Sequence, residues 1–396
     1  MSRVPSAAHV GRQALVGVRV LRLRRAAGLS QEELALLARL APGQISMLEN
    51  GRAPLDSQLI ESLAGALNCS PGYLLLDSEE PEVTRPWLRA YADAPKKVVD
   101  RAIADSATAI DLLNRTGIAR RRDLLPQFVG DLEDDGQIEA FAAEVRAAAE
   151  ITDATVIGNV MRSAERLGCI VLPLEDELGR HLGLSLRIDE APVIRVARGS
   201  LDPDRAVPGD RQRFTVAHEL GHLSLHHATP APDTPEQAAR IERQAHRFAG
   251  AYLTPADPLV EHLESLGGRV TLRTLAELKA TWGVAIKMLV LRFRQLGVIG
   301  DDHARSLYKQ ISARRWNKAE PIQVGNETAV WLSGALRKAY GESNDAILVV
   351  SRDVGLDARF VRAWCEWEPS RDYSSDDSNV IAFPGARSRH TNSEDR

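Results

Sequence analysis

Hydrophobic positions along this chain follow two periods, and the helical one dominates. In the N-terminal part, an apolar face beginning at Val18 recurs every three or four residues and is interrupted by turn residues. Ser30 followed by Glu33 has the spacing of a capping box, so a second helix is predicted to begin there. We therefore expect a bundle of short helices over residues 12–76.

The middle of the chain changes from the helical period to strand-like alternation. Residues 94–117 and 137–167 are predicted to be helical, and the apolar run 169–174 a buried strand. Two alternating segments, 184–188 and 193–196, flank an Asp-Glu-Ala-Pro turn, which predicts a hairpin. A small sheet should therefore come directly before the helix that follows.

The C-terminal third again favours helices. The apolar run 346–350 is predicted to be a short strand or a buried helix. Residues 369–396 are rich in Ser, Asp and Arg, so a disordered tail is expected there. The acidic, proline-containing stretch 77–81 marks a boundary after the first bundle.

Composition narrows the class of protein. A length of 396 residues, 44% hydrophobic and 26% charged, suits a globular chain of two or three domains. The net charge of −4 does not indicate a nucleic-acid binder, so any DNA contact must be local. The segment 12–25 offers such a local basic surface, since it holds five arginines and no acid (Arg12, Arg19, Arg22, Arg24 and Arg25).

Cysteine usage and hydropathy indicate the compartment. The three cysteines, Cys69, Cys169 and Cys365, are widely spaced, as is usual in a reducing compartment. The sequence shows no signal-peptide pattern and no apolar run long enough for a membrane span. We expect a cytoplasmic protein without membrane contact.

The strongest chemical signal is an HExxH motif inside a predicted helix over residues 211–227. Residues four apart share a helix face, so His218 and His222 can present two imidazole nitrogens to one metal ion. Glu219, one residue from the first ligand, can hold a water against the metal and take its proton. Zinc (Zn²⁺) suits such donors, but the motif alone also occurs in inert helices, and a third ligand is needed.

A second predicted helix, 241–255, supplies a candidate for that ligand. Glu242 lies at its start, 20 residues beyond His222. The intervening loop 228–235 contains three prolines and is expected to turn the chain back antiparallel. Glu242 can then reach the metal.

These motifs resemble the ImmA/IrrE family of metallo-endopeptidases. The resemblance covers about residues 135–260 and rests on these residues: Arg213-Phe214-Thr215-x-Ala217-His218-Glu219-Leu220-Gly221-His222, Glu242-x-x-Ala245-x-x-Phe248-Ala249 and Leu253-x-Pro255. It implies zinc held by His218, His222 and Glu242, with Glu219 as general base. It also implies a regulatory protein substrate, such as a partner repressor. Many members have a second glutamate where this chain has Gln244, and His246 replaces a common Asn or Asp.

The implied mechanism needs one further group, a donor for the developing oxyanion. Zinc would polarise the bound water and the scissile carbonyl, while Glu219 moves the proton to the leaving amine. His226, His227, His246 and Tyr252 are candidate donors. For the first two, polar residues that interact with the helix dipole at its end are the favoured explanation, and for Tyr252 it is core packing. His246 can also support a ligand from behind.

The N-terminal bundle resembles XRE/Cro-like repressors. The matching motifs are Leu29-Ser30-Gln31-Glu32-Glu33-Leu34-Ala35 and Ile45-Ser46-x-x-Glu49-Asn50-Gly51-Arg52-x-Pro54. This implies that Gln44 and Ser46 face the major groove, with Gln31 and Arg52 near phosphates. Pro42-Gly43 replaces polar base readers, so strong sequence specificity does not follow. A module for protein contact or homodimerisation is the alternative.

Together, these patterns predict an α+β, mostly helical protein. An all-α helix-turn-helix bundle comes first, then a zincin-like metallopeptidase domain with a small sheet, then a helical C-terminal region. The expected boundaries are 12–76, 77–134 (helical linker), 135–265, 266–368 and 369–396. The predicted function is a transcription regulator with a zinc endopeptidase. The alternative is a DNA-binding or sensory regulator whose metal site is structural or inactive.

Overall fold

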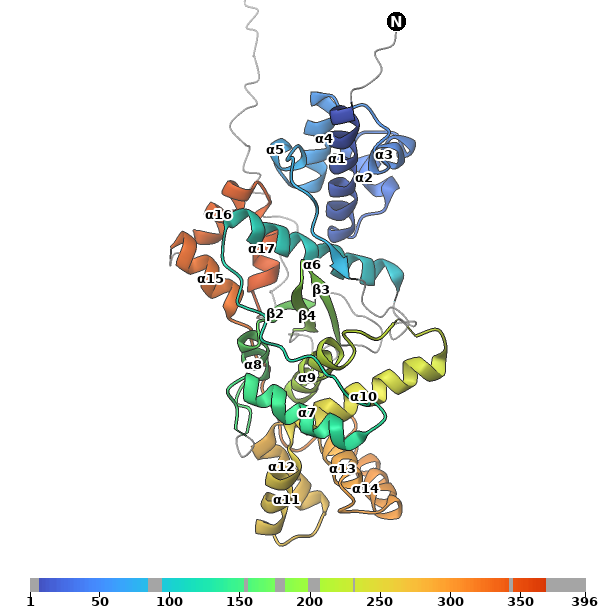
Figure 1. Ribbon diagram of the computed structural model, residues 1–396, viewed down its shortest axis with the longest axis vertical. Coiled ribbons are helices and arrows are strands. Elements are labelled where there is room, and N and C mark those ends of the chain that lie inside the picture. Colours follow the sequence, from blue (N-terminus) through green and yellow to red (C-terminus); the bar gives the residue numbers. More distant parts are fainter. Residues whose placement is uncertain are drawn as a thin grey trace, which may run out of the picture.

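The structure is a computed structural model of the 396-residue chain. It describes residues 7–84, 95–152, 156–174, 182–198, 207–230, 232–341 and 345–367. As predicted, helices dominate and the sheet is small. The molecule is elongated, and this mixed sheet lies between its two ends (Figure 1). The tail expected over residues 369–396 lies outside the described residues.

The N-terminal bundle forms as predicted. Its helices are α1 (Ala7–Ala26), α2 (Gln31–Ala38), α3 (Pro42–Glu49), α4 (Ser57–Leu67) and α5 (Pro71–Leu74). The capping box that begins α2 is present, since Ser30 Oγ accepts from Glu33 N at 3.1 Å and Glu33 Oε2 accepts from Ser30 N at 2.6 Å. The apolar face of α1 differs from the expected one: Val16 and Val20 are buried, whereas Val18 is 45% exposed.

The prediction of a basic surface on α1 is wrong for three of its five arginines, because these three are buried. Arg19, which is 0% exposed, donates to backbone carbonyls of α5 and of the segment after it, and pairs with Glu80. Arg22 is also buried and pairs with Glu80 and Asp111, while Arg24 pairs with a carboxylate of α3. Their acidic partners come from distant segments, which a local count of charges does not include. These arginines fix α1 to the rest of the chain.

The sheet has four strands in the order β1-β3-β4-β2, namely β1 (Val83–Thr84), β2 (Ile170–Leu174), β3 (Gly183–Ile188) and β4 (Ala191–Ala197). The predicted hairpin is the antiparallel pair β3–β4, and β2 lies parallel to β4. The turn that joins β3 to β4 consists of Asp189 and Glu190, whose φ angles of 45° and 64° are those that a two-residue hairpin turn requires. The Asp189 carboxylate accepts from Glu82 N at 2.8 Å and from Asn114 Nδ2 at 2.9 Å, which holds the turn.

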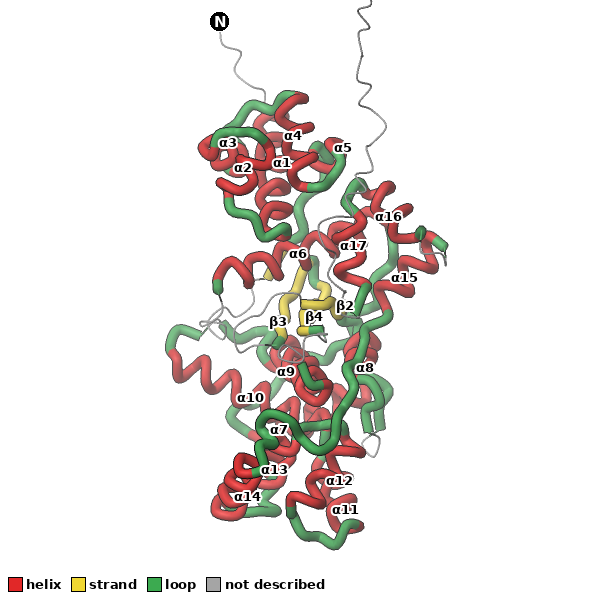
Figure 2. Tube along the Cα trace, turned by 180° about the vertical axis from the view of Figure 1, so that it is seen from behind, coloured by secondary structure: helices red, strands yellow, loops and turns green. Residues whose placement is uncertain are grey.

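Two long helices cover the two faces of this sheet, α6 (Lys96–Thr116) and α9 (Gly209–Leu225). Side chains alternate along each strand: Leu172 and Val193 share a core with α6, whereas Val171 and Ile194 share one with α9. Figures 1 and 2 show the two helices on opposite sides of the strands. Because α6 also packs along α1, it joins the N-terminal bundle to the sheet.

Further helices surround α9 and continue away from the sheet. They are α7 (Asp135–Ala148), α8 (Val160–Arg166), α10 (Pro235–Leu253), α11 (Ala256–Ser265), α12 (Leu272–Trp282), α13 (Ile286–Gln295) and α14 (Asp301–Ala313). The continuous helix expected over residues 137–167 is therefore wrong. Glu150 has a φ of 59°, which ends α7, and Asn159 Oδ1 accepts from Arg162 N at 2.9 Å to begin α8.

The last three helices return to the N-terminal bundle. They are α15 (Trp331–Tyr340), α16 (Ala346–Val354) and α17 (Ala358–Cys365), so the apolar run 346–350 is helical. Ser70 N donates to Gly355 O at 2.7 Å, and Asp357 N donates to Asn68 O at 3.0 Å. The bundle, one face of the sheet and these C-terminal helices consequently share one hydrophobic core.

Two expectations from composition can be compared with the structure. All three cysteines are free, and Cys69 and Cys169 are buried. Among the described helices, none combines the length and hydropathy needed to cross a bilayer.

A segment between α14 and α15 anchors the first turns of α9. We call residues Glu320 to Glu327 the strap. Lys279 is buried between Asp210 of α9 and Glu320, and Arg213 of α9 pairs with Glu327. These charges are almost entirely removed from water, so each depends on its partner. The strap therefore sets the position of α9.

We predict that Glu327→Ala destabilises the protein by roughly 3–5 kcal/mol, because it leaves the Arg213 guanidinium buried without its carboxylate. The midpoint of urea unfolding measures this change. Glu264→Ala, on an exposed position of α11, is the matched control and should leave the midpoint unchanged. Equal midpoints for the two variants would contradict the anchoring role of the strap.

Candidate metal centre

Helix α9 carries the HExxH motif as one continuous helix, close to the range predicted. Its period turns His218 and His222 toward α10, while Glu219 points to β3. Gly221 allows α10 to pack closely, because a Cβ at this position would lie 3.0 Å from Phe248 Cδ1. After the proline-rich loop, α10 packs against α9 and brings Glu242 to the two histidines.

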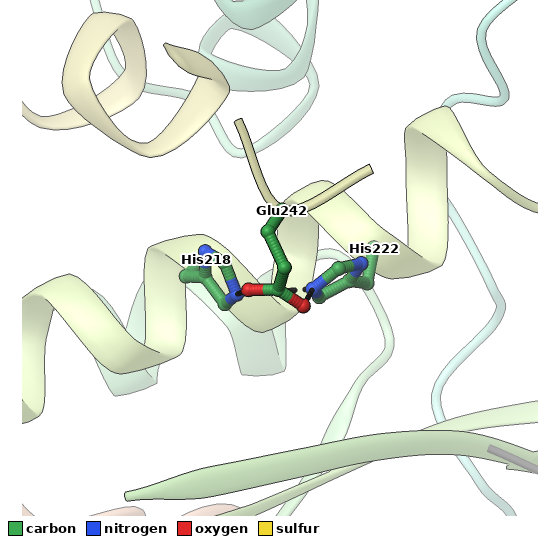
Figure 3. A group of neighbouring side chains, drawn as sticks. All are labelled: His218, His222 and Glu242. Atoms are coloured by element: carbon green, nitrogen blue, oxygen red, sulfur yellow. Dashed lines mark hydrogen bonds and ion pairs between the residues drawn. The ribbon is translucent and has the colours of Figure 1, made fainter. Parts of the chain in front are cut away.

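The three side chains predicted as ligands lie together. His218 Nε2 and His222 Nε2 are 3.0 Å apart. Glu242 Oε2 lies 3.3 Å from His218 Nε2, and Glu242 Oε1 lies 3.5 Å from His222 Nε2. Figure 3 shows the carboxylate reaching from α10 to a position between the two imidazoles. Among the described residues, this is the only such cluster of possible metal ligands.

The donor set and its spacing fit zinc. Two imidazole nitrogens and one carboxylate oxygen are the donor types of a catalytic zinc site with a fourth position for water. Ligand bonds of about 2.0–2.1 Å in a tetrahedron place neighbouring donor atoms about 3.3 Å apart. The separation of 3.0 Å between the two imidazole nitrogens is close to this value, and so are the contacts of 3.3 and 3.5 Å that they make with different oxygens of Glu242.

Glu242 is held as an anion. Burial alone would raise its pKa, but hydrogen bonds from His218 and His222 outweigh burial and lower the pKa below its ordinary value. An ionised carboxylate is the form that binds a cation. The charge state of Glu242 therefore agrees with the role of a third ligand.

The candidate base Glu219 has a partner that the sequence did not reveal. Ser185 Oγ on β3 donates to Glu219 Oε2 at 2.6 Å, and Glu219 is only 3% exposed. Gly183 makes this approach possible, because a Cβ there would lie 2.4 Å from Thr215 Cγ2 and 3.2 Å from Glu219 Cγ. In the sequence, Ser185 is visible only as a polar residue within a predicted strand, and this does not indicate that it contacts Glu219.

A second set of contacts lies behind His222, on the side away from Glu242. His222 Nδ1 lies 3.2 Å from His226 Nδ1, and His226 Nε2 lies 3.1 Å from Gln244 Oε1. Gln244 Nε2 then donates to Leu132 O at 3.0 Å. His226 is 1% exposed, and its burial lowers its pKa to about 3. Sequence reasoning did not connect these residues.

The structure separates the four candidate oxyanion donors. His226 contacts the rear of His222, and Tyr252 is buried with its hydroxyl donating to Ser163 Oγ at 3.0 Å, so neither faces a substrate. His227 is exposed at the end of α9, where its ring contacts a backbone carbonyl. The His246 ring lies 4.6 Å from the His218 ring, and this exposed residue borders the cluster.

The residues predicted to contact DNA lie on the N-terminal bundle. Gln31 Nε2 donates to Glu49 Oε2 at 2.7 Å, and Gln44 Oε1 accepts from Ala41 N at 2.9 Å. Both amides thus have partners within the bundle. Ser46 is half-buried and Arg52 is exposed. Their contacts with DNA stay a prediction.

Comparison with known families agrees with this arrangement. Residues 164–294 match the peptidase M78 family model, described as the IrrE N-terminal-like domain. Residues 20–74 match a helix-turn-helix family model. No curated protein and no solved structure shows a significant match to the chain. The two matches reproduce the order of an N-terminal helix-turn-helix followed by an ImmA/IrrE-type domain.

We predict that replacing His218, His222 or Glu242 by alanine lowers zinc affinity by more than about 100-fold. This loss is larger than the loss expected on mutating residues that only hydrogen-bond to a ligand. Each substitution removes one of three donors. Competition with a chromophoric chelator measures the affinity. His227→Ala is the control, because it changes an exposed histidine of the same helix end. Tight binding by all three variants would exclude this cluster as the zinc site.

Proposed function

We propose that this chain, in which a helix-turn-helix precedes an IrrE-like peptidase domain, is a transcription regulator carrying a zinc-dependent endopeptidase. Its substrate would be a regulatory protein, such as a partner repressor. The observation that carries the proposal is the carboxylate of Glu219, held against β3 beside the His218, His222 and Glu242 cluster. A protein of this kind would act in the cytoplasm, as expected from the sequence.

The residues of the site divide the chemistry between them. Zinc held by His218, His222 and Glu242 would supply Lewis-acid polarisation of a water and of the scissile carbonyl. Glu219 takes a proton from the attacking water and returns it to the leaving amine. Ser185 holds one oxygen of that carboxylate and so sets the direction of the other.

The alternative is a regulator whose metal site is structural or inactive. A structural site needs metal ligands but no base beside them. Here Glu219 is present, and both a serine and a closely approaching glycine, Ser185 and Gly183, accommodate it. These features favour the enzymatic function.

The helix-turn-helix match supports DNA binding, and the exposed residues indicate its character. Arg39 and Arg52 are exposed and can contact phosphates. The start of α3 offers Pro42 and Gly43, and the Gln44 amide oxygen already caps the helix. We infer DNA binding carried mainly by the phosphate backbone, with weak base readout.

One observation favours protein contact by the same bundle. Leu36, Leu37 and Met47 are exposed to 80%, 57% and 50% on neighbouring helices α2 and α3. Exposed apolar groups of this kind suit a protein partner, including a second copy of the chain. Docking of the substrate repressor, or homodimerisation, is therefore the second candidate role of the bundle.

We predict that Glu219→Gln lowers the rate of substrate cleavage by about 100-fold or more while zinc stays bound, because the amide cannot accept the proton. Cleavage of a co-encoded repressor, followed by gel electrophoresis, and zinc analysis of the same sample measure both effects. Glu236→Gln, at the exposed start of α10, is the matched control. If Glu219→Gln cleaves the substrate as fast as the wild type, the peptidase proposal is wrong.

We predict that Arg52→Ala weakens DNA binding uniformly across sequences and reduces the salt slope of the binding constant by about one. Gel-shift titrations at several salt concentrations measure the slope. Arg273→Ala, an exposed arginine on α12, should leave it unchanged. If the wild type binds no DNA but binds the repressor, and Leu37→Ser removes that binding, the bundle is a protein-docking module.

A further inference from the structure

The two ring nitrogens of a zinc-binding histidine have different tasks. The nitrogen that binds the metal must carry no proton, so the neutral ring keeps its proton on the other nitrogen. In this site Nε2 of His222 faces His218 and Glu242, so zinc bound there would leave the proton on Nδ1. His222 Nδ1 lies 3.2 Å from His226 Nδ1. One of these two nitrogens must donate and the other must accept.

The direction of this hydrogen bond follows along the chain of contacts. If His222 Nδ1 donates, His226 Nδ1 accepts, and the proton of His226 lies on Nε2. That nitrogen is 3.1 Å from Gln244 Oε1, an oxygen that accepts. The Gln244 amide nitrogen then donates to Leu132 O at 3.0 Å and to Glu133 Oε1 at 3.2 Å. Every donor along this path meets an acceptor.

The side chain at position 244 has to accept on one side and donate on the other. His226 Nε2 requires an acceptor, whereas Leu132 O and Glu133 Oε1 both require donors. A glutamine amide satisfies both sides, while an ionised glutamate only accepts. The amide of Gln244 can therefore accept from His226 and at the same time donate to the loop before α7, which an ionised carboxylate could not do.

The other histidine of the cluster lacks such support. His218 Nδ1 is buried and has no hydrogen-bond partner among the described residues, and its ring packs between Phe214 and His246. Ring packing restrains the position of His218 but does not choose its protonated nitrogen. The two imidazoles are thus held by different physical means.

We propose that His226 and Gln244 are positioning residues that fix the Nδ1–H tautomer and the ring orientation of His222, and thereby set the zinc affinity of the site. The proposal rests on the proposed function only in taking zinc as the ion. The path His222–His226–Gln244 joins the metal centre to the loop at Leu132 and Glu133, which precedes α7. The zinc ligand is therefore braced by two helices and one loop.

The first test measures the protons directly in the zinc-loaded chain and needs no substrate. Long-range proton–nitrogen correlation spectra of the full chain, with ¹⁵N-labelled histidine, distinguish the two tautomers of each of its ten histidines. Single variants assign the signals. We expect the Nδ1–H form for His222 and the Nε2–H form for His226. An Nδ1–H form of His226 overturns the proposal.

The second test measures zinc affinity by chelator competition. His226→Leu and Gln244→Leu remove acceptors from the path and should weaken binding about 10- to 100-fold. His226→Asn places an oxygen near the former Nδ1 and should recover most of the loss. His227→Leu, at the adjacent exposed histidine, should bind like the wild type. Thermal unfolding of the zinc-free variants shows whether each one is folded.

The outcomes separate this inference from the proposed function. Wild-type zinc binding with unchanged affinity in His226→Leu overturns the positioning role and leaves the peptidase proposal standing. If His226→Asn folds like the wild type but does not recover zinc affinity, the hydrogen-bond path through position 226 does not set the affinity. A wild type that binds no zinc overturns both the proposed function and this inference, whereas the two outcomes above overturn this inference alone.

Discussion

The period of helix α9 is the constraint on which the site depends. With 3.6 residues per turn, one helix presents His218 and His222 to α10, Glu219 to β3, and Val216 and Leu220 to the core. Each face therefore has its own neighbour, and none can shift without affecting the others. The glycines at positions 183 and 221 let strand and helix approach from two sides. The geometry of the metal cluster is thus a result of packing around α9.

Sequence reasoning succeeded where spacing along one element decides the arrangement. The pairing of His218 with His222, the β3–β4 hairpin and the capping box at Ser30 all follow from local periods. Glu242 could be predicted because a short loop joins two neighbouring helices, and their return packing is the simplest arrangement. The prediction of one helix over residues 137–167 was wrong because Glu150 has a left-handed backbone conformation, which the hydrophobic pattern does not indicate.

Partners from distant segments could not be predicted in this way. Ser185 meets Glu219 only once a strand packs on a helix, and Gln244 meets Leu132 across more than a hundred residues. The arginines of α1 looked like a basic surface because their acids, Glu80 and Asp111, lie far along the chain. Local charge counts therefore overstated the DNA-binding surface. Arg19 and Arg22 are instead buried ion-pair partners that hold α1 against Glu80 and Asp111.

The strap has a consequence for the order in which the chain is completed. Asp210 and Arg213, in the first turns of α9, pair with Lys279 and Glu327, of which the last follows the HExxH motif by about a quarter of the chain. During synthesis, α9 leaves the ribosome long before Glu327 does. A nascent chain therefore carries the candidate ligands His218, His222 and Glu242 before the charges that hold α9 in place are neutralised. The final position of the candidate metal centre therefore depends on a segment that is synthesised after all of its own side chains.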